Sequence, residues 1–156
     1  MKSRGHIAQP VRLSRPRERW AYAIGFGTWA TGVAWLVLHH FVRQHTAFGD
    51  LPHPLEAWSI KAHTAFALAA VWTGGVVWAA HVQPSWTQRA RRLSGIVLVV
   101  VLAVLIVSAY GLLYADEDLR RVVSLIHWTV GLALPLGGLV HVISQRRRRS
   151  HGPLRL

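Results

Sequence analysis

Four long apolar segments alternate with shorter polar or charged segments along this chain of 156 residues. They cover residues 20–42, 58–82, 93–114 and 122–144. A run of about 20 apolar residues is long enough for an α-helix to cross the hydrocarbon core of a bilayer. The first and last segments carry no Asp, Glu, Lys or Arg, and the second carries only Lys61, near its start. The pattern predicts an all-α protein, a transmembrane four-helix up-down bundle.

The composition agrees with a membrane protein and excludes several other classes. Apolar residues make up 52% of the chain and eight residues are tryptophan, which excludes a disordered chain. The chain has no cysteine. This excludes disulfides, thiolate-bound iron–sulfur clusters, a catalytic cysteine and the thioether attachment of c-type haem.

The basic residues predict the topology. Fourteen of the 18 Lys and Arg residues lie in three segments, namely residues 1–19, 83–92 and 145–156. The other four lie on the opposite side, either in the segments between the predicted spans or at the edge of a span: Arg43, Lys61, Arg120 and Arg121. Five of the six acidic residues lie on that side too. Because positively charged segments stay in the cytoplasm, both termini are predicted to be cytoplasmic. We interpret the arginines as topology and headgroup anchors, and we expect no nucleic-acid partner.

Three regions follow from this topology. Residues 1–19 form a basic cytoplasmic arm, residues 20–144 form the four-span domain, and residues 145–156 form a basic cytoplasmic tail. The N-terminal segment is too polar for a signal peptide, and the apolar segment after it is too long and lacks a small-residue cleavage site.

Six of the ten histidines lie within predicted spans, where ionisable groups are costly and usually functional; His39 and His40 lie at the outer end of the first span, and the other four lie in the second and fourth spans. His63 and His81 are 18 residues apart in the second span, about five helical turns and roughly 27 Å of rise. His127 and His141 are 14 residues apart in the fourth span, about 3.9 turns and roughly 21 Å. Each pair therefore lies on one face of its helix.

The second and fourth spans run in the same direction, so these histidines form two layers. His63 and His127 lie near the outer surface, and His81 and His141 lie near the inner one. Two layers of paired imidazoles are what two bis-histidine haems need, with each histidine as an axial ligand of the haem iron. We therefore predict a haem-binding membrane protein with all four as cofactor-binding residues.

The two spacings differ by about 6 Å of helical rise, which tilt or a local break could absorb. Gly74–Gly75 and Pro135 are suitable places for such a break. Glycines of the second and fourth spans would also let a macrocycle or a neighbouring helix approach closely. These are Gly74, Gly75, Gly131, Gly137 and Gly138.

Part of the sequence is similar to a known protein family. Residues 93–149, and above all SLIHWTVGLALPLGGLVH, resemble the last two spans of bacterial four-span di-haem b-type cytochromes. That superfamily includes cytochrome b-561, the gamma subunit of formate dehydrogenase and the cytochrome b of nickel–iron hydrogenase. The resemblance implies that His127 and His141 ligate two different haems b and that His63 is the partner at the outer haem. It also implies a multi-pass protein of the bacterial inner membrane.

One departure from the family leaves the inner haem open. Several of these families take the remaining inner ligand from the cytoplasmic end of the first span, which here reads WAYAIGFG and has no histidine. We assign that role to His81 on its depth and helical phase. The alternatives are a single outer haem, or a haem that involves His39 or His40.

The predicted function is electron transfer between a quinone pool and a redox partner. The chain has no peripheral catalytic domain, so we expect an electron-transfer subunit of an oxidoreductase whose substrate chemistry belongs to a partner subunit. The outer segment HTAFGDLPHPLEAW is long enough to cover a quinone site or to dock a partner, and the acidic residues 116–118 face the same side. Two alternatives stay open: metal or proton transport by histidines, and a haem-free membrane anchor subunit.

Overall fold

The structure is a computed structural model that describes residues 14–47, 49–83 and 93–150, the last six of these only as helical backbone. Most of the predicted basic arm, the inner loop 84–92 and residues 151–156 of the predicted tail lie outside the described residues. The arginines of the inner loop therefore lie there as well, as do His6 and His151.

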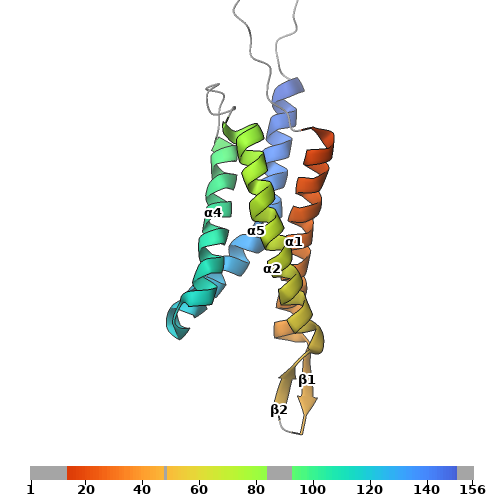
Figure 1. Ribbon diagram of the computed structural model, residues 1–156, viewed down its shortest axis with the longest axis vertical. Coiled ribbons are helices and arrows are strands. Elements are labelled where there is room, and N and C mark those ends of the chain that lie inside the picture. The colour runs from red at the N-terminus through yellow and green to blue at the C-terminus, as the bar shows by residue number, and fades with distance from the viewer. Residues whose placement is uncertain (1–13, 48, 84–92, 151–156) are drawn as a thin grey trace, which may run out of the picture. The chain divides into compact units, whose positions relative to one another are not determined.

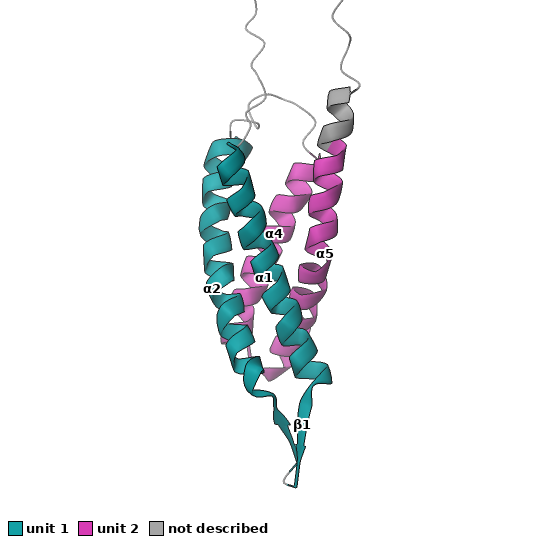
Figure 2. Ribbon diagram, turned by 90° about the vertical axis from the view of Figure 1, so that its right-hand side faces the viewer, with its two compact units in different colours: residues 1–90 teal, residues 91–156 magenta. Residues whose placement is uncertain are grey.

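The chain divides into two compact units, residues 1–90 and 91–156, and each is a pair of antiparallel helices (Figure 2). In the first unit, α1 (Arg15–Phe41) packs against α2 (Pro54–Val77), which continues as the π-helical turn η1 (Trp78–Val82). In the second unit, α4 (Leu93–Tyr114) packs against α5 (Glu117–Ser150) (Figure 1).

Within the described residues, four helices are long and apolar enough to span a membrane, which confirms the four predicted spans. Their large apolar side chains point outward: Leu68 is 69% exposed, Val107 70% and Trp72 78%. An apolar surface of this extent needs lipid around it, not water. The structure therefore indicates a multi-pass membrane protein.

The helices extend beyond the apolar segments at four of the predicted ends, including the start of α2 at Pro54. Helix α1 begins at Arg15, with a proline in its first turn, where the missing N–H costs no hydrogen bond. Helix α5 begins at Glu117 and continues to Ser150, six residues past the predicted span. Only α4 has the predicted bounds. Polar residues can continue a helix into the headgroup region, so hydropathy alone does not mark where these helices end.

The second helix of each unit begins with a side-chain cap. The Nδ1 atom of His53 accepts a hydrogen bond from the Leu55 N–H at 3.2 Å, where α2 begins. The Oδ1 atom of Asp116 accepts one from the Leu119 N–H at 2.9 Å, where α5 begins. Both bonds satisfy an N–H group that the helix itself leaves without a partner.

A short β-hairpin joins α1 to α2 and departs from the all-α prediction. Strands β1 (Arg43–Thr46) and β2 (Gly49–Pro52) pair antiparallel, and His45 lies opposite Asp50. Gly49 has a φ of 111°, which a residue with a side chain rarely adopts. The Thr46 hydroxyl closes the turn by donating to the Gly49 carbonyl at 2.7 Å. The outer segment is therefore ordered by a tight turn and is not an open loop.

Both predicted breaks coincide with irregular helix geometry. The Trp78 N–H donates to the carbonyls of both Gly74 and Gly75, and the backbone then widens into the π turn. Pro135 lies inside α5, where its ring removes one helix hydrogen bond. Figure 1 shows α5 changing direction along its length.

Candidate functional site

His63 of α2 lies against the backbone of α1. Its Nδ1 is 2.9 Å from the Thr28 carbonyl oxygen and 3.4 Å from the Thr31 hydroxyl. A carbonyl oxygen can only accept, so Nδ1 carries the proton of the neutral ring and Nε2 carries the lone pair. The bond therefore fixes the tautomer that an axial metal ligand needs.

Two glycines of α1 make this approach close enough. A Cβ built on Gly32 would lie 2.9 Å from Cε1 of His63 and 3.1 Å from its Nδ1. A Cβ on Gly27 would overlap the ring of Phe66, three positions further along α2. In a helix, the side chain of residue i+4 lies over the carbonyl of residue i. Gly32 therefore leaves the Thr28 carbonyl accessible to His63.

In the second unit, His127 of α5 is held by a serine of α4. Its Nδ1 is 2.8 Å from the Ser108 hydroxyl oxygen. That hydroxyl donates its own proton to the Leu105 carbonyl at 3.1 Å, so toward His127 it can only accept. Nδ1 of His127 is therefore the protonated nitrogen, as in His63. Ser108 is 8% exposed, and the other described side chains are all more exposed.

His141 repeats this arrangement near the other end of the same helix pair. Its Nδ1 is 3.1 Å from the hydroxyl of Ser94, which lies in the first turn of α4. The Ser144 hydroxyl donates to the backbone carbonyl of His141 at 2.8 Å. In the second unit, each of the two candidate histidines therefore lies within hydrogen-bond distance of a serine hydroxyl of α4.

His81 lies in the π turn η1 and is half-buried. A π turn holds more residues than an α turn, so the count of 3.6 residues per turn does not apply over the last turn before Val82. The prediction that His63 and His81 share a face assumed a regular α-helix, so that argument loses its geometric basis. Turns of this kind are frequent at functional sites, however, which keeps His81 a candidate.

His39 and His40, the alternative ligands, lie at the outer end of α1. Nδ1 of His39 is 2.6 Å from Oε1 of Glu56, in the first turn of α2, and its ring stacks on Trp35 at 4.7 Å. His40 is exposed and contacts His39 edge to face. His39 therefore belongs to a polar contact between α1 and α2, about ten residues from the His63 contacts along α1.

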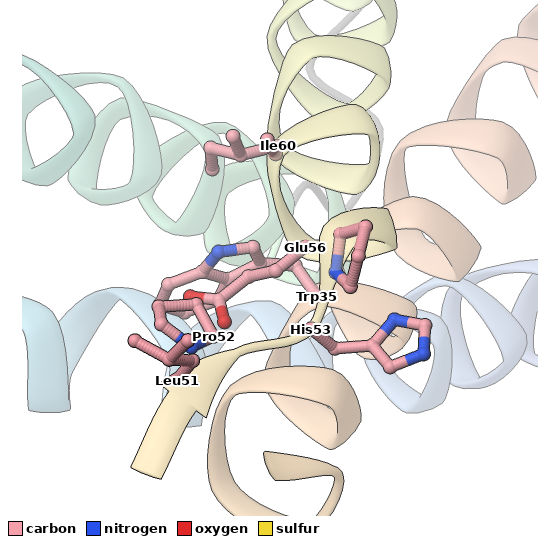
Figure 3. Close-up of a pocket in the computed structure, with 8 residues that line it drawn as sticks. Trp35, Leu51, Pro52, His53, Glu56 and Ile60 are labelled. Atoms are coloured by element: carbon pink, nitrogen blue, oxygen red, sulfur yellow. The ribbon is translucent and has the colours of Figure 1, made fainter. Parts of the chain in front are cut away.

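A shallow pocket opens beside this contact at the base of the β-hairpin (Figure 3). Its walls are mainly apolar, and Glu56 supplies a carboxylate. The lining residues are Trp35, Leu51, Pro52, His53, Pro54, Glu56, Ala57 and Ile60. The segment predicted to cover a quinone site or dock a partner thus forms one wall of an apolar pocket.

Within each unit, the closest approaches are at glycines other than those that the sequence suggested. No atom lies within 4 Å of a Cβ built on Gly74, Gly75 or Gly138. A Cβ on Gly131 or Gly137 would make ordinary contacts with leucines, at 3.8 and 3.5 Å. The closest approaches are at Gly27 and Gly32, and Gly111 of α4 also lies close to α5, where its Cβ would be 3.1 Å from Cγ1 of Val123. The small residues of GTWATG, residues 27–32, could have suggested Gly27 and Gly32, but only if the partner helix had been known.

Within the described part of the chain, no three His, Cys, Asp or Glu side chains lie together as a metal-binding group. Axial ligation of haem needs only one imidazole on each side of the ring, so this finding does not test it. Each unit positions its own histidines. The pairing of His63 with His127 and of His81 with His141 stays a prediction, because the two histidines of each pair belong to different units.

Comparison with known proteins gives no further guide. No protein-family model, no curated protein and no solved structure matches the chain.

Proposed function

We propose that the protein is a b-type cytochrome of the bacterial inner membrane that carries electrons between a quinone pool and a redox partner. It would do so through one or two bis-histidine haems b, held by a four-helix up-down bundle with both termini in the cytoplasm. His63 and His127 would ligate the outer haem, and His81 and His141 the inner one.

One observation carries this proposal. Three histidines of membrane-spanning helices, His63, His127 and His141, have Nδ1 hydrogen-bonded to an oxygen of the neighbouring helix. A histidine that binds a metal through Nε2 nearly always has its other ring nitrogen bonded in this way. The bond selects the tautomer and restrains the rotation of the ring.

The donor set fits haem better than it fits a small metal ion. The partners of these imidazoles are a carbonyl and two hydroxyls, all uncharged. Neutral imidazoles in an apolar surrounding suit iron that already has four ligands from a macrocycle. Haem iron supplies a one-electron carrier when it is bound, and its reduction potential depends on the axial ligands and on their hydrogen bonds.

A polar donor of the first unit also fits a large anionic cofactor. The indole N–H of Trp29, next to Thr28 in α1, is buried and has no hydrogen-bond partner among the described residues. Buried donors are normally satisfied, so such an atom needs an explanation. A haem propionate or another bound acceptor would satisfy it.

The separation of His127 and His141 supports transfer across the membrane. The two lie 14 residues apart on α5, roughly 21 Å along the helix axis. That distance covers most of the hydrocarbon core, which is about 30 Å thick. One helix therefore carries a candidate ligand near each surface.

The quinone part of the proposal is supported by the pocket at the outer end of α1 and α2. It combines a flat indole, aliphatic side chains and one carboxylate whose Oε1 is already bonded to His39. A quinol ring needs apolar walls and an acceptor for its hydroxyl group, and these residues supply both.

A visible spectrum of the purified protein, expressed with an ample haem supply, tests the proposal. We expect reduced b-type bands and two haems per chain. His127→Ala and His141→Ala should each lose one haem, while His45→Ala, a change at an exposed hairpin histidine, should lose none. If the wild-type protein binds no haem, it is not a cytochrome.

The two other functions are outcomes of the same experiment. A haem-free protein that binds zinc or copper stoichiometrically, or that conducts protons in vesicles, would be a histidine-based transport protein. A protein without either property would be a membrane anchor subunit. Neither is favoured by a contact within the described residues: His63, His127 and His141 bond to neutral oxygens, and the span histidine that bonds to a carboxylate, His39, lies at the end of α1 next to the hairpin.

A further inference from the structure

The two serine–histidine contacts of the second unit follow one register. Ser94 and Ser108 are 14 residues apart on α4, and His127 and His141 are 14 residues apart on α5. The helices run antiparallel, so Ser108 meets His127 and Ser94 meets His141. The same pair of groups therefore recurs after the same helical length, at both ends of the unit.

This recurrence has a functional meaning if the histidines are haem ligands, so the inference rests on the proposed function. We propose that Ser108 and Ser94 are positioning residues that orient His127 and His141 and set the electron density of the nitrogen that binds iron. The serine oxygen would accept a hydrogen bond from the Nδ1–H group, which makes Nε2 a stronger donor to the metal. It would thereby lower the reduction potential of the haem.

Ser108 meets the requirements of this role most fully. Its own proton is committed to the Leu105 carbonyl, so its oxygen is available to His127 as an acceptor. It is buried, so little water competes for the bond. An imidazole bonded at 2.8 Å to a fixed acceptor keeps one ring orientation.

Ser94 provides a weaker version of the same contact. The distance to His141 is longer, 3.1 Å, and Ser94 lies in the first turn of α4, next to the predicted membrane surface. Water competes for hydrogen bonds near the surface. The effect of removing Ser94 should therefore be smaller than the effect of removing Ser108.

A bond between helices could also exist for packing alone, since serine and histidine side chains commonly join membrane helices. A packing role predicts a loss of stability and nothing else. A positioning role also predicts a change in the reduction potential and in the tautomer of the histidine. These two readouts separate the roles.

The first experiment measures the reduction potential of Ser108→Ala in a His141→Ala background, where one haem is expected. We expect a higher midpoint potential and about 10- to 100-fold weaker haem binding. Ser124→Ala is the matched control, because Ser124 lies half-buried on α5 and makes no hydrogen bond to a histidine among the described residues. Ser108→Thr should restore the wild-type potential. Thr31 provides the precedent for threonine: its hydroxyl donates to the Gly27 carbonyl of its own helix and lies 3.4 Å from Nδ1 of His63.

The second experiment needs no haem. Nitrogen NMR of histidine-labelled apoprotein in micelles reports which ring nitrogen of His127 carries the proton. We expect Nδ1 protonation in the wild type and in Ser124→Ala, and a mixture of tautomers in Ser108→Ala.

The outcomes separate the two proposals. If the wild-type protein binds haem and Ser108→Ala leaves both the potential and the tautomer unchanged, the positioning role is wrong while the cytochrome stands. If no haem binds, the proposed function fails, and the NMR result alone still decides whether Ser108 selects the tautomer. A shifted potential in Ser124→Ala as well would also overturn the specific role of Ser108.

Discussion

The two helical hairpins hold their histidines by different means. In the first unit, His63 rests on a backbone carbonyl that is accessible because Gly32 has no side chain. In the second unit, His127 and His141 reach serine hydroxyls. A carbonyl cannot be replaced by mutation, whereas a hydroxyl can. The first contact thus depends on close packing of helices, and the second depends on single polar groups.

The packing between the two helices also differs from one unit to the other. Helix α4 is the most apolar of the four, with a mean hydropathy of 3.0, compared with 1.4 to 1.6 for the other three. Its contacts at Gly131 and Gly137 of α5 are ordinary van der Waals contacts through leucines. The α1–α2 contact has two places where no Cβ fits without movement of a ring. Substitution of Gly27 or Gly32 should therefore damage the first unit more than substitution of Gly131 or Gly137 damages the second, where Gly111 is the tightest position, with its Cβ 3.1 Å from Cγ1 of Val123.

The largest expected effect is that of Gly27→Ala. The new Cβ would overlap the ring of Phe66, so the helices must move apart or the ring must turn. We expect a loss of about 1–3 kcal/mol in the free energy of unfolding, measured by denaturation in detergent micelles. Gly131→Ala is the control in the second unit and should change it by less than about 1 kcal/mol, because its Cβ would lie 3.8 Å from Leu105.

A double-mutant cycle sharpens this prediction. Phe66→Leu makes room beside position 27, so Gly27→Ala should cost less in that background. The expected coupling energy is about 0.5–3 kcal/mol. Purely additive effects would mean that the two positions do not touch, and the contrast between the units would lose its basis.

The second prediction concerns Gly32→Ala. The Cβ would lie 2.9 Å from Cε1 of His63, and the imidazole can escape only by leaving the Thr28 carbonyl. Hydrogen bonds between membrane helices average about 0.6 kcal/mol, so the loss of stability should be about 1 kcal/mol. If His63 ligates a haem as proposed, that haem should be lost or become high-spin, as the visible spectrum would show. Gly25→Ala, where no atom lies within 4 Å of the new Cβ, should keep the wild-type spectrum.

The spans and the candidate histidines could be predicted from the sequence because they depend on local properties. A run of apolar residues long enough to cross the bilayer needs no knowledge of its neighbours, and a histidine inside such a run stands out. The partners of the histidines could not be predicted, because Thr28, Ser94 and Ser108 acquire their role only from the register of an antiparallel helix pair.

The sequence predicts a break near Gly74–Gly75, but neither the π turn itself nor the β-hairpin, for a related reason. The β-hairpin depends on Gly49 adopting a positive φ, and a single Gly–Asp step in a polar loop is a weak signal. The π turn around His81 depends on how the Trp78 N–H is shared between two carbonyls. Such shifts of one hydrogen bond leave no clear pattern in the sequence.

The third prediction compares the two helix caps. Asp116→Ala removes the charged acceptor of the Leu119 N–H and should cost about 1 kcal/mol. His53→Ala removes a neutral acceptor with a longer bond, and it should cost about half as much. Thermal unfolding followed by circular dichroism would show the order. His53→Ser and Asp116→Ser keep an acceptor at each position and should both stay near the wild type; equal losses in the two alanine variants would contradict the difference between the caps.

The smallest expected effect is that of Glu56→Gln, at the outer end of the first unit. The side chain of His39 is 36% exposed and that of Glu56 16%, so water and salt weaken the attraction between them. Pairs of this kind contribute about 0–1 kcal/mol, and glutamine keeps an oxygen that can accept from Nδ1 of His39. We expect a change in unfolding free energy below about 0.5 kcal/mol and an unchanged visible spectrum. His39→Asn should likewise keep the haem content, because in the structure His39 bonds to Glu56 next to the β-hairpin, away from the His63 contacts. If His39→Asn instead removed a haem, the outer end of α1 would supply an axial ligand. The contrast between a carbonyl-held histidine in one hairpin and serine-held histidines in the other would then no longer describe how the proposed cofactor is bound.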